Sequence, residues 1–149
     1  MHGAFDAVVV TIGALSWIED LWRYFERVAA CLRPGGRVFV REMHPATMMF
    51  AAPGEPGFDE AQPARIASSY FHTEPWVETN GVGYLSDGTY ESMPFTSFPF
   101  TLADLFGAMI GNGLRIERFK EYGKDISGLF GPLDGRGLPL SMVVVARKE

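Results

Sequence analysis

The sequence has few of the residues on which several kinds of site depend. Cys31 is the only cysteine among 149 residues, so the chain has no disulfide framework, and we expect a buried structural thiol rather than a nucleophile. The three histidines, His2, His44 and His72, are scattered, and no cysteine or carboxylate cluster has the spacing of metal ligands. We therefore expect no metal site.

Long apolar runs and basic runs are also missing. No stretch approaches the roughly 20 apolar residues needed to cross a bilayer, so we expect no membrane partner and a cytoplasmic location. No run of Lys or Arg occurs, and the net charge is −5, which argues against a nucleic-acid partner. With 47% hydrophobic and 21% charged residues, the chain has the composition of one soluble globular domain over residues 1–149.

Residues 1–42 predict a strand, a helix and a second strand with short connections. Residues 5–10 form a continuous β-branched run, which is typical of a buried parallel strand. Residues 20–32 then show helical periodicity, beginning at a potential Asp20 cap and ending at Arg33 and Pro34-Gly35-Gly36. The next apolar run covers residues 37–41. The three elements predict a parallel βαβ unit.

Residues 43–100 interrupt this pattern and predict an insertion. They contain seven of the ten prolines and many aromatic residues. Residues 69–72 and 89–91 are candidate short strands, and Asn80-Gly81 is a turn signal. Such a segment is typical of a lid or binding loop, although a poorly ordered excursion is the alternative.

Regular structure is expected again over residues 101–149. Thr101 and Asp104 resemble a capping box before a helix with one apolar face, which Gly111-Asn112-Gly113 ends. Residues 114–122 alternate imperfectly and carry many charges, as expected of a strand near a sheet edge. Residues 140–146 predict a buried strand. The last third therefore supplies one helix and two terminal strands.

These segments, in this order and spacing, resemble the second half of the class I S-adenosylmethionine-dependent methyltransferases. Phe5-Asp6-Ala7-Val8-Val9-Val10 is similar to the family's fourth strand, and Leu32-Arg33-Pro34-Gly35-Gly36-Arg37 resembles the turn before its fifth. Glu42-Met43-His44-Pro45 is similar to the strand end of a small-molecule branch. The resemblance implies an α/β fold with a partial Rossmann-like doubly wound sheet, equivalent to strands four to seven, and the aromatic- and Pro-rich insertion.

The resemblance also implies a missing part. The family holds its cofactor mainly with a glycine-rich turn after its first strand, and this chain contains no such turn between a strand and a helix. We therefore expect a truncated, C-terminal half of a methyltransferase. In the family's sheet order the fourth strand lies beside the first, so Phe5 to Val10 would form an exposed edge. A homodimer, or a complementing N-terminal half, is the expected partner along this edge.

Ligands of open parallel sheets bind at the carboxyl ends of the strands, which places residues 11–15 and 42–44 in one crevice. By resemblance, Thr11, Ile12, Gly13 and Ala14 lie beside the methionine part of S-adenosylmethionine, although Gly13 serves equally well as a simple turn. His44 and Glu42 are candidate catalytic groups. Alternatively, His44 holds the loop at Pro45, and Glu42 pairs with a neighbouring arginine, either Arg41 or Arg37.

Three aromatic residues of the insertion are candidate substrate contacts, although core packing is the alternative for each: Tyr70, Trp76 and Tyr90. The hypothesis that follows is a methyltransferase acting on a small-molecule substrate, with the activity of this chain alone in doubt. The alternative is a non-catalytic binding or assembly module derived from such an enzyme.

Overall fold

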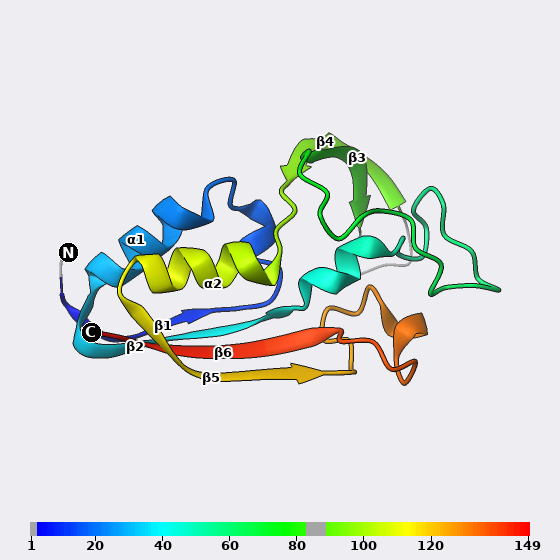
Figure 1. Ribbon diagram of the computed structural model, residues 1–149. Helices are drawn as coiled ribbons and strands as arrows, with labels where there is room; N and C mark the ends of the chain where they lie inside the picture. Colours follow the sequence, from blue (N-terminus) through cyan, green and yellow to red (C-terminus); the bar gives the residue numbers. More distant parts are fainter. Residues whose placement is uncertain (1–2, 83–88) are drawn as a thin grey trace.

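The computed structural model describes residues 3–82 and 89–149. A four-stranded sheet has the order β1-β2-β6-β5, and it is formed by β1 (Phe5–Val10), β2 (Leu32–Met43), β6 (Ser141–Lys148) and β5 (Leu114–Tyr122). The helices α1 (Leu21–Cys31) and α2 (Leu102–Gly111) lie side by side on one face of this sheet (Figure 1). The architecture is α/β, as the sequence predicts.

The expected βαβ unit is present. Asp20 caps α1 by accepting a hydrogen bond from the backbone N–H of Arg23 (2.9 Å), and the apolar face of the helix is buried. β1 and β2 are parallel, with Val8 opposite Val38 and Val10 opposite Val40. The prediction that these two valine-rich runs are neighbours is confirmed, and so is the position of β1 at one end of the described sheet.

β2 is longer than the expected strand over residues 37–41, because extended pairing begins directly after α1. Gly35 adopts a φ of +79°, a conformation that favours glycine. A Cβ on Gly36 would lie 3.0 Å from the carbonyl oxygen of Arg33 and 3.1 Å from those of Phe5 and Asp6. The second glycine therefore allows the start of β1 to approach the β2 backbone closely.

The last third of the chain also forms the expected elements. Thr101 and Asp104 make a reciprocal capping box at the start of α2. β6 lies between β2 and β5 and is antiparallel to both, while β5 forms the other edge of the sheet. A bulge between Ile116 and Arg118 interrupts β5. The main core lies between the sheet and the two helices.

The insertion differs from the expectation. Its strands are β3 (Trp76–Val82) and β4 (Thr89–Ser97), which form a separate two-stranded sheet, so Asn80-Gly81 lies within a strand and not in a turn. The predicted strand over residues 69–72 is wrong. There the Ser69 hydroxyl accepts a hydrogen bond from the N–H of Phe71, and the Ser69 carbonyl accepts one from the N–H of His72, which closes turns instead.

The remaining elements are single helical turns, namely η1 (Leu15–Trp17), η2 (Pro45–Met49) and η3 (Gly131–Leu133). η2 continues directly from the end of β2, and η1 follows the end of β1. A second small core lies beyond the carboxyl end of β2. Among the described residues, no helix has the length and apolar character that spanning a membrane requires.

Candidate functional site

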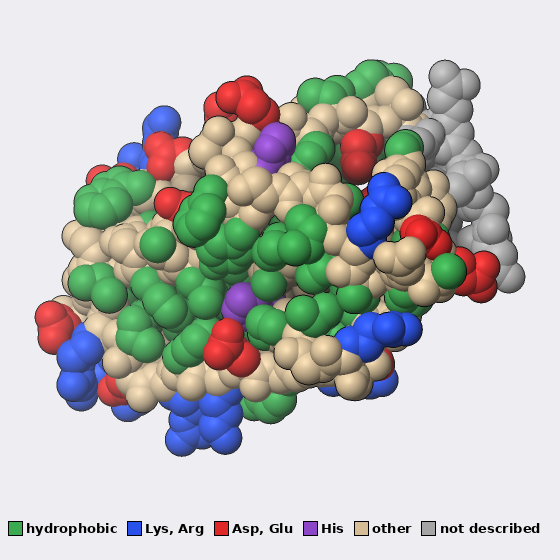
Figure 2. All heavy atoms as spheres, turned by 45° about the vertical axis from the view of Figure 1, so that its right-hand side comes forward, with side chains coloured by type: hydrophobic (Ala, Val, Ile, Leu, Met, Phe, Trp, Pro, Cys, Tyr) green, Lys and Arg blue, Asp and Glu red, His purple; other side chains and the backbone are tan. Residues whose placement is uncertain are grey.

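The site is centred on the carboxyl ends of β1 and β2, which meet at one edge of the sheet. Figure 2 is turned so that this end of the molecule comes forward, and hydrophobic side chains gather over the middle of the face it shows. The chain leaves β1 through residues 11–14 into η1, and it leaves β2 at Met43. The expected juxtaposition of the two strand ends is therefore present.

Glu42 joins these two strand ends. Its side chain is 1% exposed, and its Oε1 accepts hydrogen bonds from the backbone N–H groups of Gly13 and, at 2.8 Å, Met43. Its Oε2 accepts a third, from the N–H of Leu15, at 3.1 Å. Three charge-assisted bonds give a buried carboxylate the partners that it needs in place of water. The loop after β1 is thus fixed to the end of β2 by one side chain.

This arrangement bears on the roles left open for Glu42. The arginine Arg37 pairs instead with Glu117, at 2.7 Å between Nε and Oε2. The carboxylate also acts at a distance, because burial and then the charge of Glu42 raise the pKa of Tyr24. The geometry shows a group that holds the backbone of the loop after β1.

His44 lies two residues further along, and its side chain is nearly fully buried. Its Nδ1 accepts a hydrogen bond from the backbone N–H of Ala46 (3.0 Å), which caps η2. The neutral ring therefore carries its proton on Nε2, which lies 2.9 Å from Oε1 of Glu121 without good hydrogen-bond geometry. Burial lowers the pKa of His44, and the Glu121 carboxylate acts in the opposite direction.

Of the two roles left open for His44, the contacts show the one in which it holds the loop at Pro45. Besides the bond to Ala46, its carbonyl accepts hydrogen bonds from the N–H (2.9 Å) and hydroxyl (2.8 Å) of Thr47. A free lone pair on Nε2, which a general base needs, requires the opposite tautomer. The catalytic role of His44 stays a prediction.

The predicted substrate contacts are distributed over the insertion. Tyr70 is half-buried, and its hydroxyl accepts a hydrogen bond from the N–H of Leu102 (2.9 Å) at the start of α2. Trp76 begins β3, and its ring stacks on His72 with 4.7 Å between centroids. Tyr90 lies in β4 opposite Gly81, and its side chain is outside the described part of the structure. The hydrogen bond and ring contacts of Tyr70 and Trp76 are with Leu102, Phe71 and His72, and none of them is with residues 11–14.

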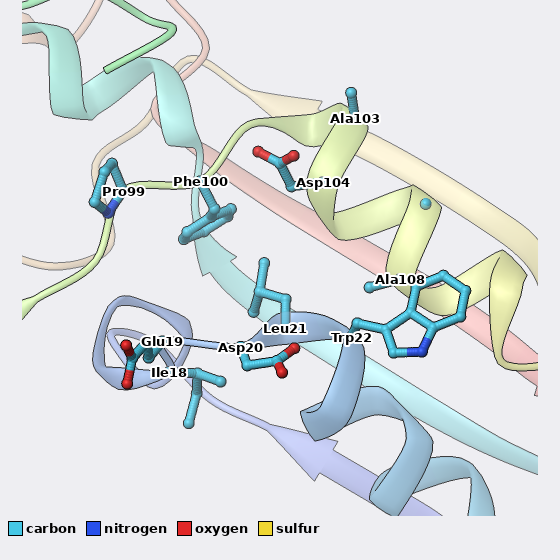
Figure 3. Close-up of a pocket in the computed structure, with 11 residues that line it drawn as sticks. Ile18, Glu19, Asp20, Leu21, Trp22, Pro99, Phe100, Ala103, Asp104 and Ala108 are labelled. Carbon is cyan, nitrogen blue, oxygen red and sulfur yellow. The ribbon is translucent and has the colours of Figure 1, made fainter. Parts of the chain in front are cut away.

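A cavity of about 490 Å³ opens between the N-terminal ends of α1 and α2 (Figure 3). Leu21, Phe100 and Ala108 give it an apolar wall, and the carboxylates of Glu19 and Asp104 lie at its rim. No Lys, Arg or His lines it. Its volume lies within the range of small-molecule sites. The first α2 residue of its lining, Ala103, directly follows Leu102, whose N–H donates to the Tyr70 hydroxyl, so the insertion and the cavity meet at the start of α2.

The resemblance implies S-adenosylmethionine as cofactor, and the loop after β1 is where its methionine part would lie. Gly13 has a φ of +80°, and a Cβ there would have no atom within 4 Å, so open space adjoins the loop. Glu42 already accepts from the N–H groups of Gly13 and Leu15, and the Thr11 carbonyl accepts from that of Ala14. Since the Ala14 carbonyl accepts from Trp17, the carbonyl oxygens of Ile12 and Gly13 are the groups that the loop offers. Carbonyl oxygens suit the ammonium of a methionine moiety. The residues present therefore fit this part of the cofactor.

Comparisons with known proteins bear on the fold. No family model matches the chain, and no curated protein matches it. Among solved structures, a candidate S-adenosylmethionine-dependent methyltransferase from Listeria monocytogenes matches with a TM-score of 0.69 at 18% identity, over 100% of this chain and 63% of that one. An S-adenosylmethionine-dependent methyltransferase from Mesorhizobium loti matches with a TM-score of 0.63 at 24% identity, over 99% and 63%.

A more distant match is geranyl diphosphate C-methyltransferase from Streptomyces coelicolor A3(2), solved with Mg²⁺, geranyl diphosphate and S-adenosyl-L-homocysteine. It has a TM-score of 0.55 and 13% identity, over 99% of this chain and 48% of that one. The chain thus spans about 63% of the length of the first two structures. The fold is that of part of a class I S-adenosylmethionine-dependent methyltransferase, as the resemblance implied.

Two features of the site were missed from the sequence. Glu121 faces His44 only because the β5 bulge restores Phe119 and Glu121 to the helix-covered side of the sheet. The three N–H groups that donate hydrogen bonds to Glu42 belong to the backbone, so the residue types at these positions do not reveal them. A buried Glu between apolar strand residues was the one available signal.

Proposed function

We propose that this chain, which has the fold of part of a class I methyltransferase, forms the acceptor-side portion of an S-adenosylmethionine-dependent methyltransferase for small molecules. The observation that carries the proposal is the loop after β1, which Glu42 fixes at the carboxyl ends of two parallel strands. Open parallel sheets bind their ligands at this edge. The fold likeness is consistent with it.

When bound, S-adenosylmethionine would supply a methyl group on a sulfonium, from which a neutral thioether is a good leaving group. The chain's contribution is then to hold the cofactor, to align the acceptor with the methyl group, and to shield both from water. Residues 11–14 would hold the methionine ammonium with carbonyl oxygens, and Glu42 keeps that loop in place. Tyr70, Trp76 and Tyr90 of the insertion would cover the acceptor and exclude water. His44 would serve as a base only if Glu121 and Ala46 released its ring.

Calorimetric titration of S-adenosylmethionine into the purified chain tests the proposal. Because the glycine-rich turn that mainly holds the cofactor in the family is not in this chain, we expect weak, saturable heat. We expect Gly13→Ala to abolish it, because the new Cβ enters the open space beside the loop. Gly54→Ala is the matched control. Gly54 has a φ of +91° and equally open surroundings, so the two variants carry similar backbone strain, but Gly54 lies in the insertion. Equal binding by both variants would remove residues 11–14 from the cofactor site.

The second candidate function is a non-catalytic assembly module, and the edge position of β1 favours it. β1 pairs only with β2 in the described sheet, and Phe5 and Val9 are 43% and 66% exposed. An uncovered apolar edge favours pairing with another chain. A folded chain that shows no heat with S-adenosylmethionine but forms a defined dimer would support this function over the enzymatic one.

The proposed partner along β1 is a second copy or a separate polypeptide that supplies the N-terminal half of the fold. Light scattering gives the mass in solution, and hydrogen exchange reports on the β1 amides. We expect a dimer in which the β1 amides are protected from exchange on both sides of the strand, by β2 on one side and by the partner strand on the other. A monodisperse monomer with rapidly exchanging amides over residues 5–10 would refute pairing between copies.

A further inference from the structure

The cavity between α1 and α2 has no role in the methyltransferase site proposed above. Its volume is about 490 Å³, and residues 18–22 and 99–108 line it, so its walls come from the two helices and the segments that lead into them. It shares no residue with the loop at 11–14, with Glu42 or with the β1 edge. Cavities of this size hold small molecules, so this one is a candidate site of its own.

The floor of the cavity is apolar and already formed. Leu21, Phe100 and Ala108 are 9%, 6% and 4% exposed, and all three belong to the main core, which holds their side chains in place. The Trp22 ring lies beside Ala108 at one end of the cavity (Figure 3). It packs so closely on α2 that a Cβ on Gly111 would lie 2.2 Å from it. A ligand with an apolar part would therefore meet a surface that needs no rearrangement.

Three carboxylates surround this floor, those of Glu19, Asp20 and Asp104. Asp20 uses Oδ1 to accept the hydrogen bond from the N–H of Arg23 that caps α1. Asp104 uses Oδ2 to accept from the N–H (2.8 Å) and the hydroxyl (2.7 Å) of Thr101. Among the described residues, no lysine, arginine or histidine forms an ion pair with any of the three. One oxygen of each aspartate and both oxygens of Glu19 are thus left for a ligand.

The N-termini of α1 and α2 offset only part of this negative charge. Each N-terminus carries about half a positive elementary charge, so the two together offset about one of the three carboxylates. None of the residues that line the cavity is basic. The cavity therefore combines an apolar floor with a negatively charged rim. Its complement is a molecule with an apolar part and a positive charge, and the π face of an indole such as that of Trp22 also attracts cations.

We propose that this cavity binds a small organic cation, namely a molecule with an ammonium group attached to an apolar body about the size of one aromatic ring. The apolar body rests on the buried floor, and the ammonium lies among the three carboxylates, where its hydrogen bonds are charge-assisted. An anion is repelled by the rim, and an ammonium without an apolar body leaves the floor uncovered. Binding at this site does not depend on S-adenosylmethionine or on methyl transfer.

The probe is para-fluorophenethylammonium, titrated with the full chain and observed by fluorine NMR, which detects weak binding through chemical shift and line width. Two further ligands separate the contributions. The anion para-fluorohydrocinnamate has the same ring with the opposite charge, and fluoroethylammonium has the charge without the ring. We expect saturable binding of the probe and at least about tenfold weaker binding of each of the other two ligands.

Two variants test the site itself. Gly107 lines the cavity three residues after Asp104, and a Cβ there would meet no atom within 4 Å. Gly107→Leu fills this space with a better helix former, so the variant should fold and bind the probe at least about tenfold more weakly. Glu19→Lys reverses the rim charge that caps no helix and should weaken binding about fivefold. Glu60→Lys, the same charge change at an exposed position of the insertion, is its matched control and should leave binding unchanged.

Any of four results would overturn the proposal. The first is an unchanged probe signal in an excess of protein. The second is equal affinity of the probe for wild type and for folded Gly107→Leu, which would place the probe elsewhere. The third is binding of fluoroethylammonium or the anion as tight as that of the probe. The fourth is displacement of the probe by S-adenosylmethionine, which would assign the cation to the cofactor site. The cofactor titration is a separate measurement, so either proposal can fail without the other.

Discussion

Replacing Glu42 by Gln tests how strongly the two strand ends are held together. The carboxylate accepts from Gly13 and Met43 at Oε1 and from Leu15 at Oε2. An amide keeps one acceptor oxygen, but its NH₂ group would face the Leu15 N–H, donor against donor. That buried N–H loses its partner at a cost of about 1–3 kcal/mol, and the other two bonds lose their charge assistance.

We expect Glu42→Gln to lower the free energy of unfolding by about 3 kcal/mol, measured by urea denaturation. Native-state hydrogen exchange should show faster exchange at Gly13 and Leu15 than in wild type. Glu26→Gln is the matched control, because its side chain is 54% exposed on α1, and it should change stability by less than about 0.5 kcal/mol.

Equal free energies of unfolding for Glu42→Gln and Glu26→Gln would refute this reasoning. This result would mean that Gly13 and Leu15 find other acceptors at no cost, and that the loop after β1 does not depend on Glu42. Loss of stability without faster exchange at these two amides would also count against it.

Three further predictions follow from local contacts. Gly111→Ala should destabilise the protein by about 1–3 kcal/mol despite the better helix propensity of Ala, because a Cβ there would lie 2.2 Å from the Trp22 ring. Gly107→Ala is the control: a Cβ there would have nothing within 4 Å, so it should stabilise by about 0.5–1 kcal/mol, and thermal unfolding measures both variants. Because burial lowers the pKa of His44, the unfolded chain binds a proton on this histidine more readily than the folded chain does, so the free energy of unfolding should fall as the pH drops below about 6.5. The urea midpoints at pH 7.5 and pH 5.5 should therefore differ less in His44→Asn than in wild type. Tyr70→Phe should cost about 1 kcal/mol by removing the acceptor of an N–H at the start of α2, and an unchanged midpoint would show that water replaces it.

Periodicity and capping residues predicted most of the main domain. Asp20 and the Thr101–Asp104 box begin the two helices, and the valine-rich runs over residues 5–10 and 140–146 become strands of one sheet. These signals are local, so they survive without an alignment. The same locality explains the failure in the insertion, where the hydroxyl and the carbonyl of Ser69 accept hydrogen bonds that close turns in a stretch that has strand composition.

The site was less predictable than the fold. The juxtaposition of the two strand ends followed from topology, because carboxyl ends of parallel strands share an edge. The partner of His44 did not, because a strict alternation along β5 would place Arg118 and Lys120 under the helices and Glu121 on the opposite side. The one-residue bulge before Arg118 reverses this assignment, and single-sequence patterns rarely locate a bulge.

The Pro34-Gly35-Gly36 turn has a consequence for how chains of this kind are recognised. Gly36 is required because three carbonyl oxygens crowd the position of its missing Cβ, and Gly35 because of its positive φ. The first demand comes from packing β1 beside β2 and the second from the turn before the paired part of β2, so the fold itself accounts for both glycines. Selection for folding alone would therefore preserve this turn even in related proteins that have lost catalytic activity. A genome survey based on the turn identifies chains with this fold, and other residues are needed to identify the active enzymes among them.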